Sequence, residues 1–196
     1  MKIIARCTVR LLQQILKNNP HIKYQHVIGF SLGAQIAGTI AKILNEKKID
    51  KLDRITGLDP ALLRFENGGS ILNADSATVV DIIHTNSGVS GQILPIGTVD
   101  FYANGGIRQP GCEYDLYPVY CHHHRAYYYF AESINYRRYN YGIFANLSCS
   151  CLAKDFSLLG GDFEDVHVRV GEYLDLKTRG VYYFKTNSVM PFALKV

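Results

Sequence analysis

A serine between two glycines is the first feature of this sequence that could perform chemistry. The segment from Gly29 to Gly33 reads Gly-Phe-Ser-Leu-Gly, follows an apolar run and precedes a run of small residues. A Gly-x-Ser-x-Gly turn between a strand and a helix strains the serine backbone and projects its oxygen above the sheet. We therefore predict that Ser31 is a nucleophile and that both glycines let the strand and the helix approach closely. The N–H group of Leu32, at the start of the helix, could bind a developing oxyanion.

A nucleophilic serine needs a base, and the base needs a carboxylate that orients it. Asp59 ends a predicted strand, so it would lie at the same edge of the sheet as Ser31. Asp75 lies in a polar turn, where a solvated or capping role is expected, and Asp81 lies inside an apolar strand, where it would accept internal hydrogen bonds. We favour Asp59 as the acid.

The histidines leave the choice of the base open. His84 ends an apolar strand and could either reach the same edge or be a buried structural residue. His122, His123 and His124 are consecutive, and any one of them could act as the base. Adjacent side chains point in different directions, and no cysteine or carboxylate spacing supports a zinc site, so we predict no metal.

The elements that must position these residues alternate between helices and strands. We predict helices at 4–18, 32–44 and 123–136, and strands at 24–30, 53–59, 78–86, 97–106 and 179–187. This alternation favours an α/β fold with a largely parallel sheet. No linker or internal repeat divides residues 1–196, which predicts a single domain.

The composition excludes several classes of protein. Hydrophobic residues make up 47% of the chain and charged residues 19%, as in a globular protein. The net charge of +4 is spread along the sequence, so we expect no nucleic-acid partner. No apolar run is long enough for a transmembrane segment, and Arg6 and Arg10 favour a helix over a signal peptide at the start.

The cysteines indicate an oxidising compartment. Four of the five lie in the C-terminal half, which is typical of a disulfide-bonded, secreted protein. The odd count leaves at least one of them unpaired within the chain. The glycosylation sequon that begins at Asn146 agrees with secretion.

From about residue 24 onward the chain resembles the pancreatic-lipase-like family of animals, especially its insect branch of neutral lipases and phospholipase A1. The matching segments include HVIGFSLGAQIAG, RITGLDPA, DIIHTN, CHHHRAYYYFAESI and TRGVYYFKTN, in matching order and spacing. The resemblance implies an α/β-hydrolase fold and a secreted serine esterase that hydrolyses glycerolipids without a cofactor. It also implies a lipid or phospholipid substrate met at a lipid–water interface.

The resemblance also selects the base. The family's catalytic histidine is the second residue after a cysteine and lies two residues before an arginine. That pattern falls on His123, between Cys121 and Arg125. The implied triad is Ser31, Asp59 and His123, which leaves the other two consecutive histidines as bystanders.

A lid is a further implication of the resemblance. A disulfide between Cys112 and Cys121 would close residues 113–120 into a loop over the site, and phospholipase A1 members carry such a short lid. Its aromatic and aliphatic residues are suited to contact with lipid. The alternative is an ordinary tied surface loop whose aromatic side chains pack locally.

The chain also departs from the family pattern. Phe30 stands where the family usually has histidine, outside the triad, and the crowded Cys149 and Cys151 cannot both find partners of the family type. The family's second oxyanion donor comes from a His-Gly loop, and the sequence contains no His-Gly pair. We therefore expect the C-terminal part of a lipase domain, incomplete at the N-terminus, with a free edge on the strand 24–30. The alternative functions are a non-catalytic lipid-binding or yolk-type protein on the same scaffold, or an inactive fragment.

Overall fold

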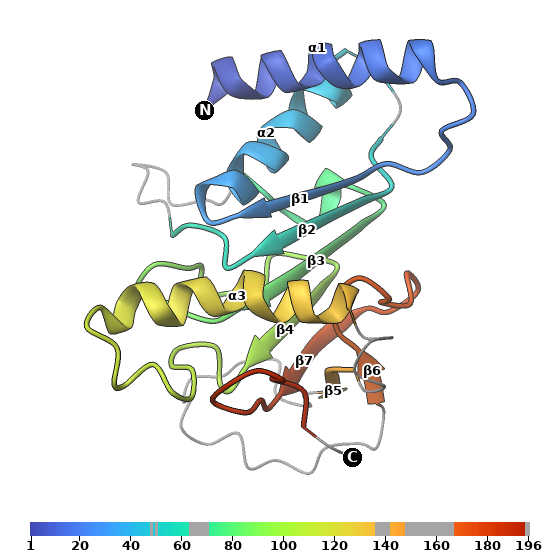
Figure 1. Cartoon of the computed structure of the whole chain (residues 1–196). Coiled ribbons are helices and arrows are strands. Elements are labelled where there is room, and N and C mark those ends of the chain that lie inside the picture. Colours follow the sequence, from blue (N-terminus) through green and yellow to red (C-terminus); the bar gives the residue numbers. More distant parts are fainter. Residues whose placement is uncertain (48, 50, 63–70, 136–141, 148–166, 195–196) are drawn as a thin grey trace.

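The computed structural model describes residues 1–47, 49, 51–62, 71–135, 142–147 and 167–194. Its helices are α1 (Lys2–Asn18), α2 (Leu32–Glu46), the short 3-10 helix η1 (Ala74–Ser76) and α3 (Pro118–Ile134). Its strands are β1 (His26–Phe30), β2 (Arg54–Leu58), β3 (Val79–His84), β4 (Val99–Ala103), β5 (Phe144–Leu147), β6 (His167–Arg169) and β7 (Gly180–Phe184). Figure 1 shows the strands in one twisted sheet with helices on both sides.

The sheet has the strand order β1-β2-β3-β4-β7-β5-β6. Neighbouring strands from β1 through β4 to β7 are parallel, and β5 is antiparallel to both β7 and β6. The predicted α/β class with a mostly parallel sheet is therefore confirmed. Neither β5 nor β6 was predicted from the sequence.

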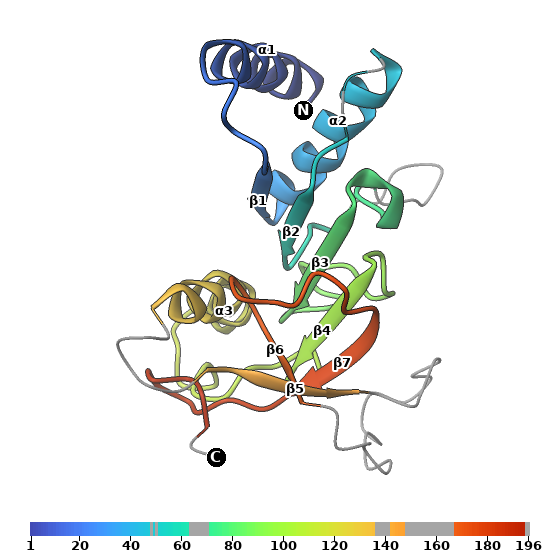
Figure 2. The same cartoon turned by 90° about the vertical axis from the view of Figure 1, so that its right-hand side faces the viewer.

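The helices divide between the two faces of the sheet (Figures 1 and 2). Helices α1 and α2 share a buried apolar cluster with Ile55, Val80 and Ile82. Helix α3 packs on the other face, where its Tyr129 shares a second cluster with Ile83. Successive side chains of a strand point to opposite faces, so β3 contributes to both clusters.

Local sequence features explain the positions of α2 and α3. Helix α2 approaches the segment around Leu72 closely because part of its buried face is made of small residues. A Cβ atom on Gly38 would lie only 2.6 Å from the Cα atom of Leu72. Helix α3 begins at Pro118, five residues before the predicted start at His123, because proline suits the first turn of a helix. No helix in the described part of the chain is both long and apolar enough to cross a membrane.

The parallel strands place one set of residues at a common edge. Ser31 follows β1, Asp59 follows β2 and His84 ends β3, so all three lie at the carboxyl ends of neighbouring strands. Ligands of open α/β sheets bind at this edge. Helix α3 crosses the sheet with its first turns near the same edge, as Figure 1 shows.

Candidate active site

Ser31 occupies a strained turn between β1 and α2. Its φ of 53° and ψ of −119° are unusual for a residue other than glycine. The turn is held by hydrogen bonds from the Ser31 N–H to the Leu58 carbonyl (2.9 Å) and from the Ala61 N–H to the Ser31 carbonyl (3.1 Å). Strain of this kind is concentrated at functional sites. Leu32 is the first residue of α2, where N–H groups find no acceptor in their own helix.

The close approach of β1 and α2 depends on one of the two glycines. A Cβ atom on Gly29 would lie 2.5 Å from the carbonyl oxygen of Gly33 and 2.6 Å from the backbone nitrogen of Ala34. A Cβ atom on Gly33 would meet no atom within 4 Å. The expectation that both glycines are needed is therefore wrong for Gly33, whose Cβ position faces open space.

Asp59 is fully buried, and backbone groups fix its carboxylate. Its Oδ1 atom accepts hydrogen bonds from the N–H groups of Thr85 (2.8 Å) and Asn86 (3.0 Å). Its Oδ2 atom lies 2.5 Å from Nδ1 of His123. These hydrogen bonds hold the Asp59 side chain in one rotamer, in which its carboxylate can orient the imidazole of His123.

His123 lies in α3 with its ring turned toward Asp59. When Nδ1 donates its proton to the carboxylate, Nε2 carries the lone pair that a general base needs. The His123 ring lies 4.5 Å, between centroids, from the ring of Phe30, the residue before Ser31. Within the described residues Ser31 Oγ makes no hydrogen bond, and such catalytic contacts often tighten only when substrate binds.

Two of the other candidate histidines, His122 and His84, have structural hydrogen-bond partners. His122 Nδ1 accepts a hydrogen bond from the Gln109 N–H (2.9 Å), and burial, with a contribution from Arg108, lowers the pKa of His122. His84 is fully buried and its Nε2 lies 2.8 Å from Asp100 Oδ1, so it is the structural residue rather than a candidate base. No group of three potential metal ligands occurs among the described residues.

The two rival carboxylates also have other roles. Asp75 is exposed in η1, while Asn73 provides the cap. Asp81 forms a bidentate ion pair with Arg54, at 2.8 and 2.9 Å, and accepts a hydrogen bond from the Thr56 hydroxyl. Asp81 is thus the internal hydrogen-bond partner expected from the sequence.

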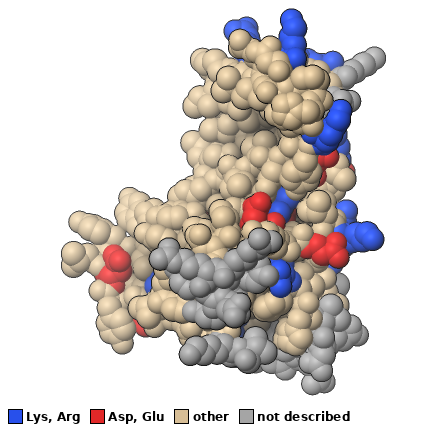
Figure 3. Space-filling view, turned by 45° about the vertical axis from the view of Figure 1, so that its right-hand side comes forward, with Lys and Arg blue, Asp and Glu red and all other residues tan. Residues whose placement is uncertain are grey.

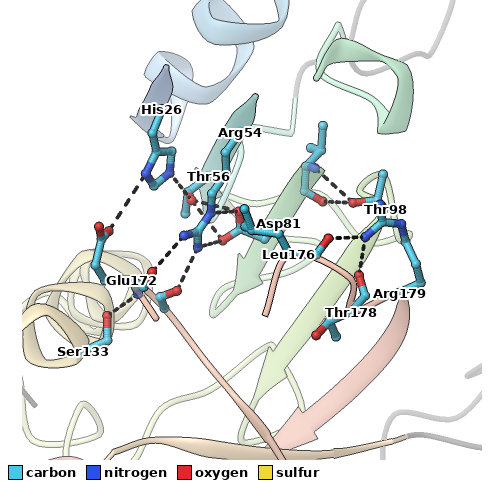
Figure 4. A network of polar contacts seen from close by, with 12 residues as sticks. His26, Arg54, Thr56, Asp81, Thr98, Ser133, Glu172, Leu176, Thr178 and Arg179 are labelled. Carbon is cyan, nitrogen blue, oxygen red and sulfur yellow. Dashed lines mark hydrogen bonds and ion pairs between the residues drawn. The ribbon is translucent and has the colours of Figure 1, made fainter. Parts of the chain in front are cut away.

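This ion pair belongs to a polar network that fastens the far end of α3 to the sheet (Figure 4). Arg54 also donates to the carbonyls of Gly171 (2.8 Å) and Glu172 (3.0 Å). The Glu172 N–H in turn donates to Ser133 Oγ near the end of α3 (2.9 Å). The helix that carries His123 is therefore held at both ends.

The expected disulfide between Cys112 and Cys121 is present. It closes a loop before and within the first turn of α3 whose large side chains are exposed to solvent, namely Tyr114, Leu116, Tyr117, Val119 and Tyr120. Cys7 is a free, exposed thiol. Cys149 and Cys151 lie outside the described residues.

Sequence reasoning missed the residues that shape the carboxylate pocket. A Cβ atom on Gly91 would lie 2.4 Å from Oδ1 of Asp59, so only glycine fits beside the carboxylate. The N–H donors of Thr85 and Asn86 are backbone groups, which leave no signal in side-chain type. Phe30 was noted only as a departure, although its ring packs against His123.

Comparison with known proteins agrees with this geometry. Residues 2–192 match the Lipase family, so the match also includes α1, which precedes the segments that carry the resemblance. The chain is 35% identical to human pancreatic lipase-related protein 3 and 40% identical to phospholipase A1 of Vespa velutina, over 86% and 68% of its own length. It is 39% identical to hepatic triacylglycerol lipase of Oryctolagus cuniculus over 62% of its length.

The chain spans less than half the length of these three relatives, namely 41%, 43% and 26% in the same order. The family match over residues 2–192 nevertheless contains the serine turn, the buried aspartate and the helix with the paired histidine. The family match covers nearly the whole chain. The chain belongs to the Lipase family.

Proposed function

We propose that this protein is a serine carboxylic-ester hydrolase that acts on glycerolipids, with Ser31, Asp59 and His123 as its catalytic triad. The observation that carries the proposal is the buried contact of 2.5 Å between Asp59 and His123, beside a strained serine turn. A serine, an imidazole and an orienting carboxylate form the arrangement that activates a hydroxyl for acyl transfer.

The reaction follows from the positions of these groups. His123 Nε2 takes the proton of Ser31 as Oγ attacks the ester carbonyl, and Asp59 stabilises the imidazolium that forms. The N–H of Leu32 donates to the oxyanion of the tetrahedral intermediate. His123 then protonates the leaving alcohol. In the second half of the reaction His123 removes a proton from water, which attacks the acyl-enzyme, and then returns the proton to Ser31 as the acid is released.

The proposed substrate class rests on the relatives and on the tied loop. Two relatives are named as a triacylglycerol lipase and a phospholipase A1. Cys112 and Cys121 are only nine positions apart, so the loop between them is a small cover for a lipid site. The disulfide also supports secretion, because disulfides persist in oxidising compartments.

Hydrolysis of a soluble short-chain ester tests the triad. Ser31→Ala and His123→Ala should each lower the rate by roughly three or more orders of magnitude, because triad members act as a unit. His124→Ala is the matched control, since it removes the neighbouring imidazole and should keep most of the activity. Equal losses in both histidine variants would contradict the role of His123. An inactive chain with an intact fold would favour the alternatives, a non-catalytic lipid-binding protein or an inactive fragment.

The tied loop predicts how the rate depends on the physical state of the substrate. We expect little increase in rate when a triglyceride passes its solubility limit, because the small loop leaves the site open. Phospholipid or short-chain esters should be hydrolysed at least as fast as long-chain triglyceride. A sharp jump in rate at the solubility limit would contradict this prediction.

A further inference from the structure

Besides the tied loop of residues 113–120, a second segment exposes apolar side chains, and it has no role in the proposed triad. It is the turn Asn187–Phe192, which follows β7. Since β7 runs parallel to β4 in the same sheet, the turn lies at the edge that carries Ser31 and Asp59. In Figure 1 the turn is drawn in dark red below α3 and reaches toward the side of the tied loop.

The turn is held in a fixed shape. The Asn187 N–H donates to the carbonyl of Phe192 (2.8 Å), which closes the turn. The buried carboxylate of Glu132 in α3 accepts hydrogen bonds from the N–H groups of Phe192 and Ala193, both at 2.7 Å. The tip of the turn can therefore present side chains without the loss of entropy that ordering a loose loop requires.

Arg125 joins this turn to the base of the tied loop. Its guanidinium donates to the carbonyls of Ser188 (2.8 Å) and Pro110 (2.9 Å) and lies 4.7 Å above the ring of Phe192. Its Nε also lies 3.5 Å from Sγ of Cys112, in the disulfide. Arg125 thus links the turn directly to the base of the tied loop.

The tip of the turn exposes apolar side chains to solvent. Val189 is 70% exposed and Met190 is 52% exposed, and the tied loop adds Tyr114 at 88% and Leu116 at 92%. Exposed apolar patches of this kind mark sites of interaction, and tyrosine suits the boundary between acyl chains and headgroups.

We propose that the turn Asn187–Phe192 is a second lipid-contacting element, which inserts Val189 and Met190 into a lipid surface beside the tied loop. The tip itself carries no charge, as acyl chains require. Exposed charges of both signs lie in the neighbouring segments: Lys185 precedes the turn, Arg108 precedes the tied loop, and Glu113 and Asp115 lie within that loop. Mixed charges complement the phosphate and choline of a zwitterionic lipid. On the face that Figure 3 presents, blue side chains gather at the end of the molecule that carries α1 and α2, and blue and red side chains are both present on the rest.

A tryptophan reporter tests insertion independently of catalysis. The chain contains no tryptophan, so Val189→Trp introduces a single fluorophore at the tip. With phosphatidylcholine vesicles its emission should shift to shorter wavelength and be quenched by brominated acyl chains. Ile3→Trp is the matched control at an exposed position of α1, remote from the turn in Figure 1, and should show neither effect. Absence of a shift at position 189, or equal shifts at both positions, would overturn the proposal.

Vesicle partitioning of serine variants gives a second readout. The double variant Val189→Ser and Met190→Ser should bind phosphatidylcholine vesicles at least roughly tenfold more weakly, because two apolar side chains no longer enter the lipid. Hydrolysis of a soluble ester should be unchanged. The proposal rests on the proposed function only for its choice of lipid. Vesicle binding is therefore measured on Ser31→Ala as well, in which the proposed nucleophile is absent. A wild-type chain that binds the vesicles but does not hydrolyse a soluble ester would reject the triad alone. Unchanged binding in the double variant would reject the lipid contact alone.

Discussion

His26, at the start of β1, shows how a single side chain acquires a defined protonation state. The Thr56 hydroxyl donates to Asp81, so its oxygen accepts the hydrogen bond from Nε2 of His26 at 2.7 Å. Burial, with the neighbouring positive charge of Arg54, lowers the pKa of His26 to about 4. The imidazole is therefore neutral in the folded protein at neutral pH.

The same shift predicts a loss of stability in acid. The unfolded chain binds this proton with an ordinary pKa near 6.5, above the folded value, so the unfolded state is favoured as the pH falls from 6.5 toward 4. His26→Gln should flatten that part of the pH dependence, since glutamine keeps a donor for Thr56 and binds no proton. Urea unfolding of both proteins between pH 7.5 and 5 measures the slopes, and identical slopes would contradict the assignment.

The close packing of β1 against α2 depends on the absence of a Cβ atom at Gly29. Gly29→Ala would place a Cβ atom against the backbone of α2, so it should destabilise the fold by roughly 1–3 kcal/mol and displace Ser31. Gly33→Ala is the matched control in the same motif and should be neutral or stabilising by up to about 1 kcal/mol, because a Cβ atom there meets open space. Denaturant unfolding and ester hydrolysis of both variants test this, and a larger loss for Gly33→Ala would be the contrary result.

The elements that sequence patterns predicted were those with strong local signals. The strands β1 to β4 and β7 are apolar runs between turn residues, and the buried face of α2 is marked by its small residues. The short strands β5 and β6 form by pairing with β7 and with each other, a long-range condition that a local pattern does not contain. The same reason explains why the residues alone did not distinguish His123 from its neighbours, since the choice depends on how α3 lies across the sheet.

Among the described strands of the molecule, β1 forms one edge of the sheet, and this edge is apolar. Strand β1 pairs with β2 and stands first in the strand order, and its Ile28 is 47% exposed. An exposed apolar edge strand favours association between chains, and such association remains a prediction for this chain. Charged side chains at such an edge oppose this pairing.

Ile28→Lys should therefore slow aggregation of the chain measured by light scattering. Ile3→Lys is the matched control, because it adds the same charge at a position of α1 that is 77% exposed and is not in the sheet. The edge explanation predicts a clear improvement only for the strand variant. Equal improvement in both would show that net charge, rather than the β1 edge, limits solubility.

Labelling with a fluorophosphonate probe examines the activated serine itself, even if turnover is slow. The probe should form one covalent adduct, located on Ser31 by peptide mass spectrometry, in the wild-type chain and in His124→Ala. Labelling should be lost in His123→Ala and after denaturation, because the hydroxyl reacts only when the imidazole held by Asp59 removes its proton. An adduct at another residue, or undiminished labelling of Ser31 in His123→Ala, would contradict the triad of Ser31, Asp59 and His123.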